Sequence, residues 1–247
     1  ICKTVSIKNR GTGIEDAARN ARYSVFEKLL KKNDLLILAH HADDQIETML
    51  FRLFRGSGIK GMSGMPISRL LGNGELFRPL LPFFRRDLES YASANQINWI
   101  EDDSNLDIAF DRNFIRHKLI PTINERWPNS SFKLNRSANI FAESDFLINI
   151  LAQKDFKIVT EVSERVGWSI SIDKLNGFEI IRQKNILRYW FNLHNLTLPS
   201  HAVLDNALNQ MIGSKIDAEP IVSWGDLQLR RFNKKLYLLP LNFEDPN

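Results

Sequence analysis

The sequence has a single cysteine, Cys2, among its 247 residues. One cysteine excludes a disulfide framework, and it also excludes a site built from several cysteine ligands, such as an iron–sulfur cluster. The chain lacks any apolar run near the ~20 residues that a membrane-spanning helix requires, and it has no internal repeat or low-complexity tract. These absences predict a globular, cytoplasmic protein with no membrane partner.

Neither sign of charge is in strong excess. The chain has 33 lysines and arginines against 29 aspartates and glutamates, a net charge of +4. An excess this small is a weak indication of an anionic partner. The basic residues are unevenly distributed, however, and five of them fall within fifteen residues: Arg112, Arg116, His117, Lys118 and Arg126.

The first half of the chain has the pattern of a parallel α/β fold. Residues 14–32 place apolar side chains at helical spacing, and residues 35–39 (L-L-I-L-A) form a short apolar run that suits a strand buried on both faces. A second helix is expected from Asp43 or Asp44 to Arg55. Strand, polar turn and helix are half of a parallel α/β unit, in which functional groups gather at the carboxyl ends of strands. We therefore expect part of a Rossmann-like parallel-sheet domain.

The pattern changes after Trp127-Pro128, which is the best candidate for a domain boundary. Residues 1–127 are expected to form the α/β domain, and residues 128–247 a mostly helical α+β domain. This second domain should contain a long helix over residues 131–157 and two helices within residues 177–211. Strands are expected near residues 168–172, 221–224 and 227–239.

Residues 40–48 read H-H-A-D-D-Q-I-E-T and carry the strongest concentration of reactive side chains. Asp44 and Glu47 have the spacing of a capping box, which by itself would explain both carboxylates. A zinc site is disfavoured, because adjacent histidines usually diverge and the sequence has no H-x-x-x-H pair. For His40, a buried structural histidine and a ligand contact are both open.

Two arginine pairs have helical spacing. Arg19 and Arg22 are three residues apart, and Arg112 and Arg116 are four apart, so each pair shares one helix face. A solvated helix face explains either pair taken alone. The glycine-punctuated residues 56–64 suit either a loop that closes over a ligand or a connector.

Several segments occur together in a fixed order. They are G-T-G-I-E-D-A-A-R-N-A-R-Y over residues 11–23, the H-H-A-D-D-Q-I-E-T segment, R-G-S-G over 55–58, W-I-E-D-D-S-N over 99–105 and D-R-N-F-I-R-H-K-L-I-P over 111–121. In combination they resemble the tRNA(Ile)-lysidine synthetases, a family of PP-loop ATP pyrophosphatases. The resemblance covers residues 11–127 closely, and it extends more weakly over the second domain, where it implies tRNA recognition.

The resemblance implies an ATP-dependent ligase. Members of this family adenylate C2 of the wobble cytidine of tRNA(Ile) with a CAU anticodon, and the amine of free L-lysine then displaces AMP. The product, lysidine, changes the codon that is read from AUG to AUA. ATP and Mg²⁺ are the implied cofactors, with the metal ligands unassigned. A second copy of the chain, giving a homodimer, is a further candidate partner.

Roles for individual residues follow from the same resemblance. Asp44 and Glu47 are expected to bind lysine and to carry the proton transfer. The expected ATP or phosphate contacts are Arg22, Arg19, His40, Arg112 and Arg116. The expected tRNA contacts are Arg55, Arg126, Arg136 and Arg188, with Lys154, Lys157, Arg182 and Lys184 as further candidates.

Two alternative functions stay open at this stage. A related PP-loop tRNA thiolase is disfavoured, because such enzymes typically use cysteines and this sequence has only Cys2. A tRNA-binding module without chemistry is the alternative from a different class. The sequence also departs from the family pattern, because it contains no S-G-G-x-D-S phosphate-binding loop. We expect that loop to precede Ile1 and a further domain to follow Asn247 in the parent enzyme.

The purified 247-residue chain is therefore expected to bind ATP weakly and to transfer no lysine, because the backbone N–H cradle that such a loop supplies to the phosphates is missing. Incubation with ATP, labelled lysine and tRNA(Ile) measures both properties. Lysidine formed above background by this chain alone would contradict the expectation.

Overall fold

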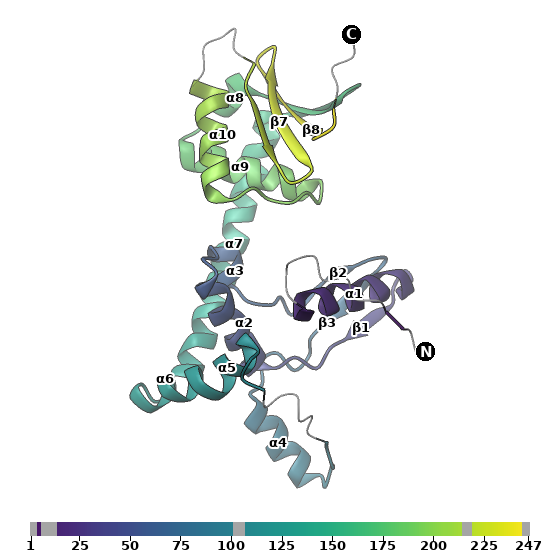
Figure 1. Cartoon of the computed structure of the whole chain (residues 1–247), viewed down its shortest axis with the longest axis vertical. Helices are drawn as coiled ribbons and strands as arrows, with labels where there is room; N and C mark the ends of the chain where they lie inside the picture. Colours follow the sequence, from purple (N-terminus) through teal and green to yellow (C-terminus); the bar gives the residue numbers. More distant parts are fainter. Residues whose placement is uncertain (1–3, 6–13, 101–106, 214–218, 244–247) are drawn as a thin grey trace. The chain divides into compact units, whose positions relative to one another are not determined.

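A computed structural model of the chain describes residues 4–5, 14–100, 107–213 and 219–243 (Figure 1). These residues divide into two compact units, 1–145 and 146–247. The division falls inside one long helix, α7 (Ser130–Val159), and so lies later than the predicted boundary after Trp127. The reason is that Leu134, Ala138 and Phe141 of α7 pack into the apolar clusters of the first unit.

The first unit has a small sheet with one parallel pair of strands, and the second unit combines helices with a larger sheet. The predicted α/β class, a parallel-containing sheet followed by an α+β domain, is confirmed. No helix among the described residues is long and apolar enough to cross a membrane.

The first unit contains three short strands and a series of helices. Strand β1 pairs in parallel with β3, and β2 pairs with β3 in antiparallel fashion, so the order is β1-β3-β2. Figure 1 shows α1 lying alongside this sheet. The elements are α1 (Ile14–Leu29), β1 (Leu35–Ile37), α2 (Ala42–Phe54), α3 (Ile59–Met62), β2 (Ser68–Leu71), β3 (Gly74–Phe77), α4 (Arg85–Ala94), α5 (Asp111–Phe114), η2 (Ile115–Leu119) and α6 (Ile120–Arg126).

Strand β1 is not buried on both faces, which corrects the prediction from its apolar run. Leu35 is 51% exposed and Ile37 is 61% exposed, whereas Leu76 on the neighbouring strand is fully buried. Within the described residues β1 is an edge strand, and the face that carries Leu35 and Ile37 has no cover.

The turn between β2 and β3 lies close against α1. Gly72 has a φ of +56°, and a Cβ atom at this position would lie 2.5 Å from the carbonyl oxygen of Glu27. Both the left-handed backbone and the close approach require glycine here. A larger residue at position 72 would therefore push the turn away from α1.

The segment 111–126 is helical throughout, although it contains Pro121. The π-helical turn η2 (Ile115–Leu119) joins α5 to α6, and Pro121 lies in the first turn of α6. A proline has no N–H and crowds the carbonyl four residues earlier. The wider π turn before Pro121 lets the helix continue past it.

The second unit is built around a five-stranded antiparallel sheet of order β4-β5-β8-β7-β6. The prediction gave three strands here, because it missed β4 and treated β7 and β8 as one. Helices α9 and α10 cover one face of this sheet (Figure 1). Besides the end of α7, the elements are β4 (Glu161–Glu164), β5 (Gly167–Ser171), α8 (Ile172–Asn176), α9 (Ile180–Leu193), α10 (His201–Gly213), β6 (Ile221–Trp224), β7 (Leu227–Phe232) and β8 (Lys235–Pro240).

The main apolar core of the second unit lies between these helices and the sheet. On α9, Ile186, Leu187 and Trp190 are fully buried at helical spacing. Full burial of an aliphatic side chain of this size contributes about 1.5–3 kcal/mol. The buried stripe of α9 is therefore a principal source of the unit's stability.

Replacing Leu187 by alanine is expected to destabilise the protein by roughly 2–5 kcal/mol, because it removes a buried side chain and leaves a cavity. Ile181→Ala, on the same helix at a position that is 73% exposed, is the matched control and should stay within about 0.5 kcal/mol of the parent. Urea denaturation followed by tryptophan fluorescence measures both. Equal losses would show that the buried stripe of α9 is not the core.

Candidate active site

The candidate site forms where β1 ends and α2 begins. His41 is the N-cap of α2, and its backbone N–H donates to Asp44 Oδ2 at 2.9 Å. A capping carboxylate is thus present, but one turn earlier than the Asp44/Glu47 spacing suggests. Asp44 therefore caps the N-terminal end of α2, whereas the Glu47 carboxylate binds a different residue.

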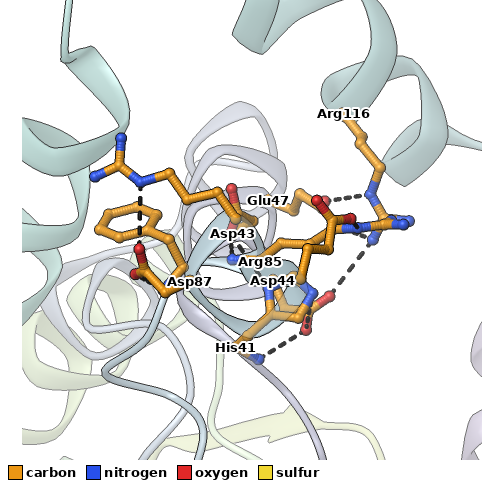
Figure 2. Close-up of polar contacts among 10 residues, drawn as sticks. His41, Asp43, Asp44, Glu47, Arg85, Asp87 and Arg116 are labelled. Atoms are coloured by element: carbon orange, nitrogen blue, oxygen red, sulfur yellow. Dashed lines mark hydrogen bonds and ion pairs between the residues drawn. The ribbon is translucent and has the colours of Figure 1, made fainter. Parts of the chain in front are cut away.

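That partner is Arg116, which lies in the π turn η2 and is 69 residues from Glu47 along the chain. Arg116 Nε donates to Glu47 Oε1 at 2.6 Å and Nη2 donates to Oε2 at 3.0 Å, a bidentate pair. Nη2 also lies 3.4 Å from Asp44 Oδ1. Figure 2 shows the guanidinium of Arg116 facing both carboxylates. The structure therefore joins three of the predicted site residues in one cluster.

Burial dominates the electrostatics of Glu47, which is 2% exposed. Burial raises the pKa of Glu47 above its usual value, even though Arg116 acts in the opposite direction. The hydrogen bond to Glu47 raises the pKa of Arg116 in turn. The result is a carboxylate with higher proton affinity than a solvated glutamate, next to a permanently charged guanidinium.

Asp43 links this site to α4. Its Oδ2 accepts the backbone N–H of Arg85 at 2.8 Å, and the His41 ring lies 3.4 Å from the same oxygen. Burial alone would raise the pKa of Asp43, but the nearby His41 ring and the hydrogen bond from the Arg85 amide lower it. Burial alone would lower the pKa of His41, but Asp43 and Asp44 raise it. His41 and Asp43 are both labelled in Figure 2, and neither was assigned a role from the sequence.

His40 faces a different partner from His41. The Nε of Arg78 donates to His40 Nδ1 at 3.3 Å, and the pKa of His40 falls to about 4, chiefly through burial. The His40 side chain is half-buried beyond the end of β1, and Arg78 is its polar partner. Arg78 was not singled out from the sequence. The signal that identifies it is the parallel pairing of β1 with β3, which brings the carboxyl ends of both strands to one edge.

The glycine-punctuated segment 56–64 is held onto α2. The side-chain amide of Gln45 exchanges hydrogen bonds with Met65, with the Met65 N–H donating to Oε1 at 2.6 Å and Nε2 donating to the Met65 carbonyl at 3.0 Å. Arg52 Nη1 donates to the carbonyls of Gly61 and Gly64 at 3.2 and 2.6 Å. These bonds favour a connector with a fixed position over a loop that closes on a ligand.

Three further arginines were predicted to contact phosphate, and they lie on α1 and α5. Arg19 is half-buried on α1 with its guanidinium 5.4 Å from the centre of the Tyr23 ring, whereas Arg22 is exposed. Arg112 is half-buried one turn before Arg116.

The predicted tRNA contacts are mostly at the surface. In the first unit, Arg55 lies 4.0 Å from the Phe51 ring centre, and Arg126 and Arg136 are exposed. In the second unit Arg188 is half-buried, while Arg182 forms a bidentate pair with the buried Asp155 at 2.9 and 2.5 Å. Arg182 is thus charge-paired with Asp155 within the second unit.

The family resemblance implies Mg²⁺, but the described residues contain no preformed set of ligands for it. Among the described residues, no group of three or more His, Cys, Asp or Glu side chains is placed to hold a metal ion. Asp44 is already engaged by the His41 amide and Arg116.

Replacing Arg116 by methionine should destabilise the protein at pH 7 by roughly 3 kcal/mol, because it leaves a buried carboxylate without its partner. The loss should shrink at low pH. The pKa of Glu47 is raised in the folded protein. The stability that this shift contributes is fully present below the unfolded pKa, near ~4.3, and it is lost as pH rises through the folded pKa. Urea unfolding at pH 5 and pH 8 measures this. Arg126→Met, at an exposed position, is the control, and an equal, pH-independent loss in both variants would contradict the pairing.

Comparison with known proteins shows which family the chain resembles. Residues 1–123 match the PP-loop domain, and residues 170–237 match the TilS substrate binding domain. The tRNA(Ile)-lysidine synthase of Coxiella burnetii (strain RSA 493 / Nine Mile phase I) is 42% identical over 228 residues, which cover 92% of this chain and 50% of that protein. That of Serratia proteamaculans (strain 568) is 42% identical over 242 residues, covering 98% and 54%.

A third relative, the tRNA(Ile)-lysidine synthase of Legionella pneumophila (strain Lens), is 39% identical over 231 residues, covering 94% of this chain and 53% of that protein. The chain thus spans about half the length of the curated relatives it matches. Two domain matches in the order of the family and alignments over more than nine-tenths of the chain lead to one conclusion: the chain belongs to the tRNA(Ile)-lysidine synthase family of PP-loop proteins.

Proposed function

We propose that this chain is part of an ATP-dependent ligase that joins L-lysine to C2 of the wobble cytidine of tRNA(Ile) with a CAU anticodon. The reaction proceeds through an adenylated cytidine and yields lysidine, so that the codon read changes from AUG to AUA. The observation that carries the proposal is the buried Glu47 carboxylate, held by Arg116 beside Asp44 at the end of β1.

The chemistry needs a group that accepts a proton from lysine. Free lysine has a pKa near ~10.4, so presenting its neutral amine at pH 7 costs about 4–5 kcal/mol unless the site assists. A carboxylate can first hold the ammonium group and then accept its proton. Glu47 suits the second step, because burial raises its pKa and so its proton affinity.

Asp44 is the partner of Glu47 in this scheme. The two carboxylates are three residues apart on α2, and both contact the same Arg116 guanidinium. An incoming ammonium group would share this carboxylate pair with Arg116. We therefore assign Arg116 to positioning Glu47 rather than to the phosphate contact expected from the sequence.

The nucleotide would bind near the same strand edge. The match of residues 1–123 to the PP-loop domain supports an adenine nucleotide as the activating substrate. Arg19, Arg22, Arg112 and His40 are our candidates for its phosphates. Arginine suits this role because its planar guanidinium can contact two phosphate oxygens at once. Mg²⁺ would enter with the nucleotide and supply charge neutralisation.

For the tRNA, we propose surface cations of both units as phosphate contacts. The match of residues 170–237 to the TilS substrate binding domain supports a substrate-binding role for the second unit. The candidates are Arg55, Arg126, Arg136 and Arg188. Binding through such contacts should weaken steeply as salt concentration rises.

A module that binds tRNA without chemistry is the alternative. It would use the same surface cations, but it would have no need of a buried carboxylate with raised proton affinity. Removal of that carboxylate therefore separates the two functions.

Glu47→Gln should reduce lysine transfer by at least ~100-fold, the effect typical of losing a general base, and should leave tRNA binding unchanged. The assay uses a protein that contains this chain together with an S-G-G-x-D-S loop upstream of it. Lysidine formation and tRNA affinity are measured in parallel. Glu125→Gln, at an exposed position on α6, is the matched control. Full activity of the Glu47→Gln protein would refute Glu47 as the base, and absence of lysidine formation by the parent protein would refute the ligase.

A further inference from the structure

A buried arginine lies behind His40. Arg78 directly follows β3, and β3 pairs in parallel with β1, which leads into His40. Parallel strands end at a common edge, so Arg78 and His40 approach each other although they are 38 residues apart. Arg78 is only 2% exposed and is among the largest fully buried side chains described.

Three groups fix the guanidinium of Arg78. Nη1 donates to the Pro66 carbonyl at 2.7 Å, and Nη2 lies 3.5 Å from the Tyr23 hydroxyl. The Nε donates to His40 Nδ1 at 3.3 Å. A guanidinium has donors only and stays charged, so its Nε–H cannot act as an acceptor. The Nδ1 of His40 must therefore be the acceptor, without a proton.

We propose that Arg78 is a positioning residue that fixes His40 as the neutral tautomer with its proton on Nε2. His40 then offers an uncharged N–H donor, on the ring side opposite Arg78, to the adenine nucleotide at the end of β1. The identity of this ligand rests on the proposed function, whereas the tautomer does not.

Protonation of His40 would work against this arrangement. An imidazolium carries a proton on both nitrogens, and its Nδ1–H would then point at the Arg78 Nε–H. Burial contributes most to keeping the pKa of His40 at about 4, and Arg78, Arg19 and Arg112 lower it further against the opposing effect of Asp44. At pH 7 the ring is neutral, so a nucleotide can bind to it without a change in its protonation.

The tautomer can be measured directly on the unmodified 247-residue chain. Long-range ¹H–¹⁵N correlation spectra distinguish the two neutral tautomers of histidine and follow protonation with pH. We expect the Nε2–H pattern for His40 at pH 7, with a titration midpoint far below the usual ~6.5. An Nδ1–H pattern, or an ordinary midpoint, would overturn the inference without any variant being made.

Two variants separate positioning from a general structural effect. Arg78→Met removes the donor to Nδ1, so the His40 midpoint should rise from about 4 and the tautomers should mix. Tyr23→Phe removes a different contact of the same guanidinium and keeps the aromatic ring, so His40 should be unchanged. If Arg78→Met does not fold, the spectra of the parent and of Tyr23→Phe still decide, because both must show the Nε2–H tautomer.

The role of the Nε2–H donor is tested by a matched pair of substitutions. The amide nitrogen of a glutamine reaches near the Nε2 position of histidine, whereas that of an asparagine reaches only near Nδ1. In the protein that carries the upstream loop, His40→Gln should keep an ATP KM about tenfold below that of His40→Asn, the effect of one hydrogen bond. Equal values would overturn the role of Nε2. Failure of the proposed function is distinct, because the parent protein would then form no lysidine while the tautomer of His40 stayed as expected.

Discussion

Burial of the Glu47 carboxylate is the constraint around which the first unit is organised. A buried carboxylate is costly unless it is paired and hydrogen-bonded, and the pairing group, Arg116, comes from a helix 69 residues away along the chain. Ile46 and Leu50 of α2 form an apolar cluster with Ile115, the residue next to Arg116. Apolar packing therefore brings the two helices together, and the bidentate pair fixes their orientation.

The π turn at Ile115–Leu119 belongs to the same arrangement. Pro121 cannot continue a regular hydrogen-bond ladder, and the wider turn before it holds both Ile115, which is buried against α2, and Arg116, which faces Glu47. The local irregularity and the long-range pair thus lie at one point of the chain. π turns are frequent at functional sites because they redirect side chains without ending the helix.

The sequence predicted the positions of helices better than it predicted which strands pair and which residues contact one another. The extents of α1 and α7 follow approximately from apolar periodicity, which is a local property. The position of β1 at the edge of the described strands and the presence of the short polar strand β4 depend on which strands pair, and no local pattern encodes that. Asp44, Glu47 and Arg116 were each singled out from the sequence, but their contact was not, because it joins segments that only the fold brings together. Arg78 was missed for the same reason.

The two adjacent histidines show how one short segment produces two electrostatic environments. Successive side chains of an extended backbone point to opposite sides, so His40 contacts the cation Arg78 while His41 lies beside the carboxylates Asp43 and Asp44. The pKa of His40 is lowered, chiefly by burial, and the carboxylates raise that of His41. A ligase of the proposed kind must bind an anionic nucleotide and a cationic amine next to each other. A strand end with cations on one side and carboxylates on the other can bind both, because each ligand meets the opposite charge.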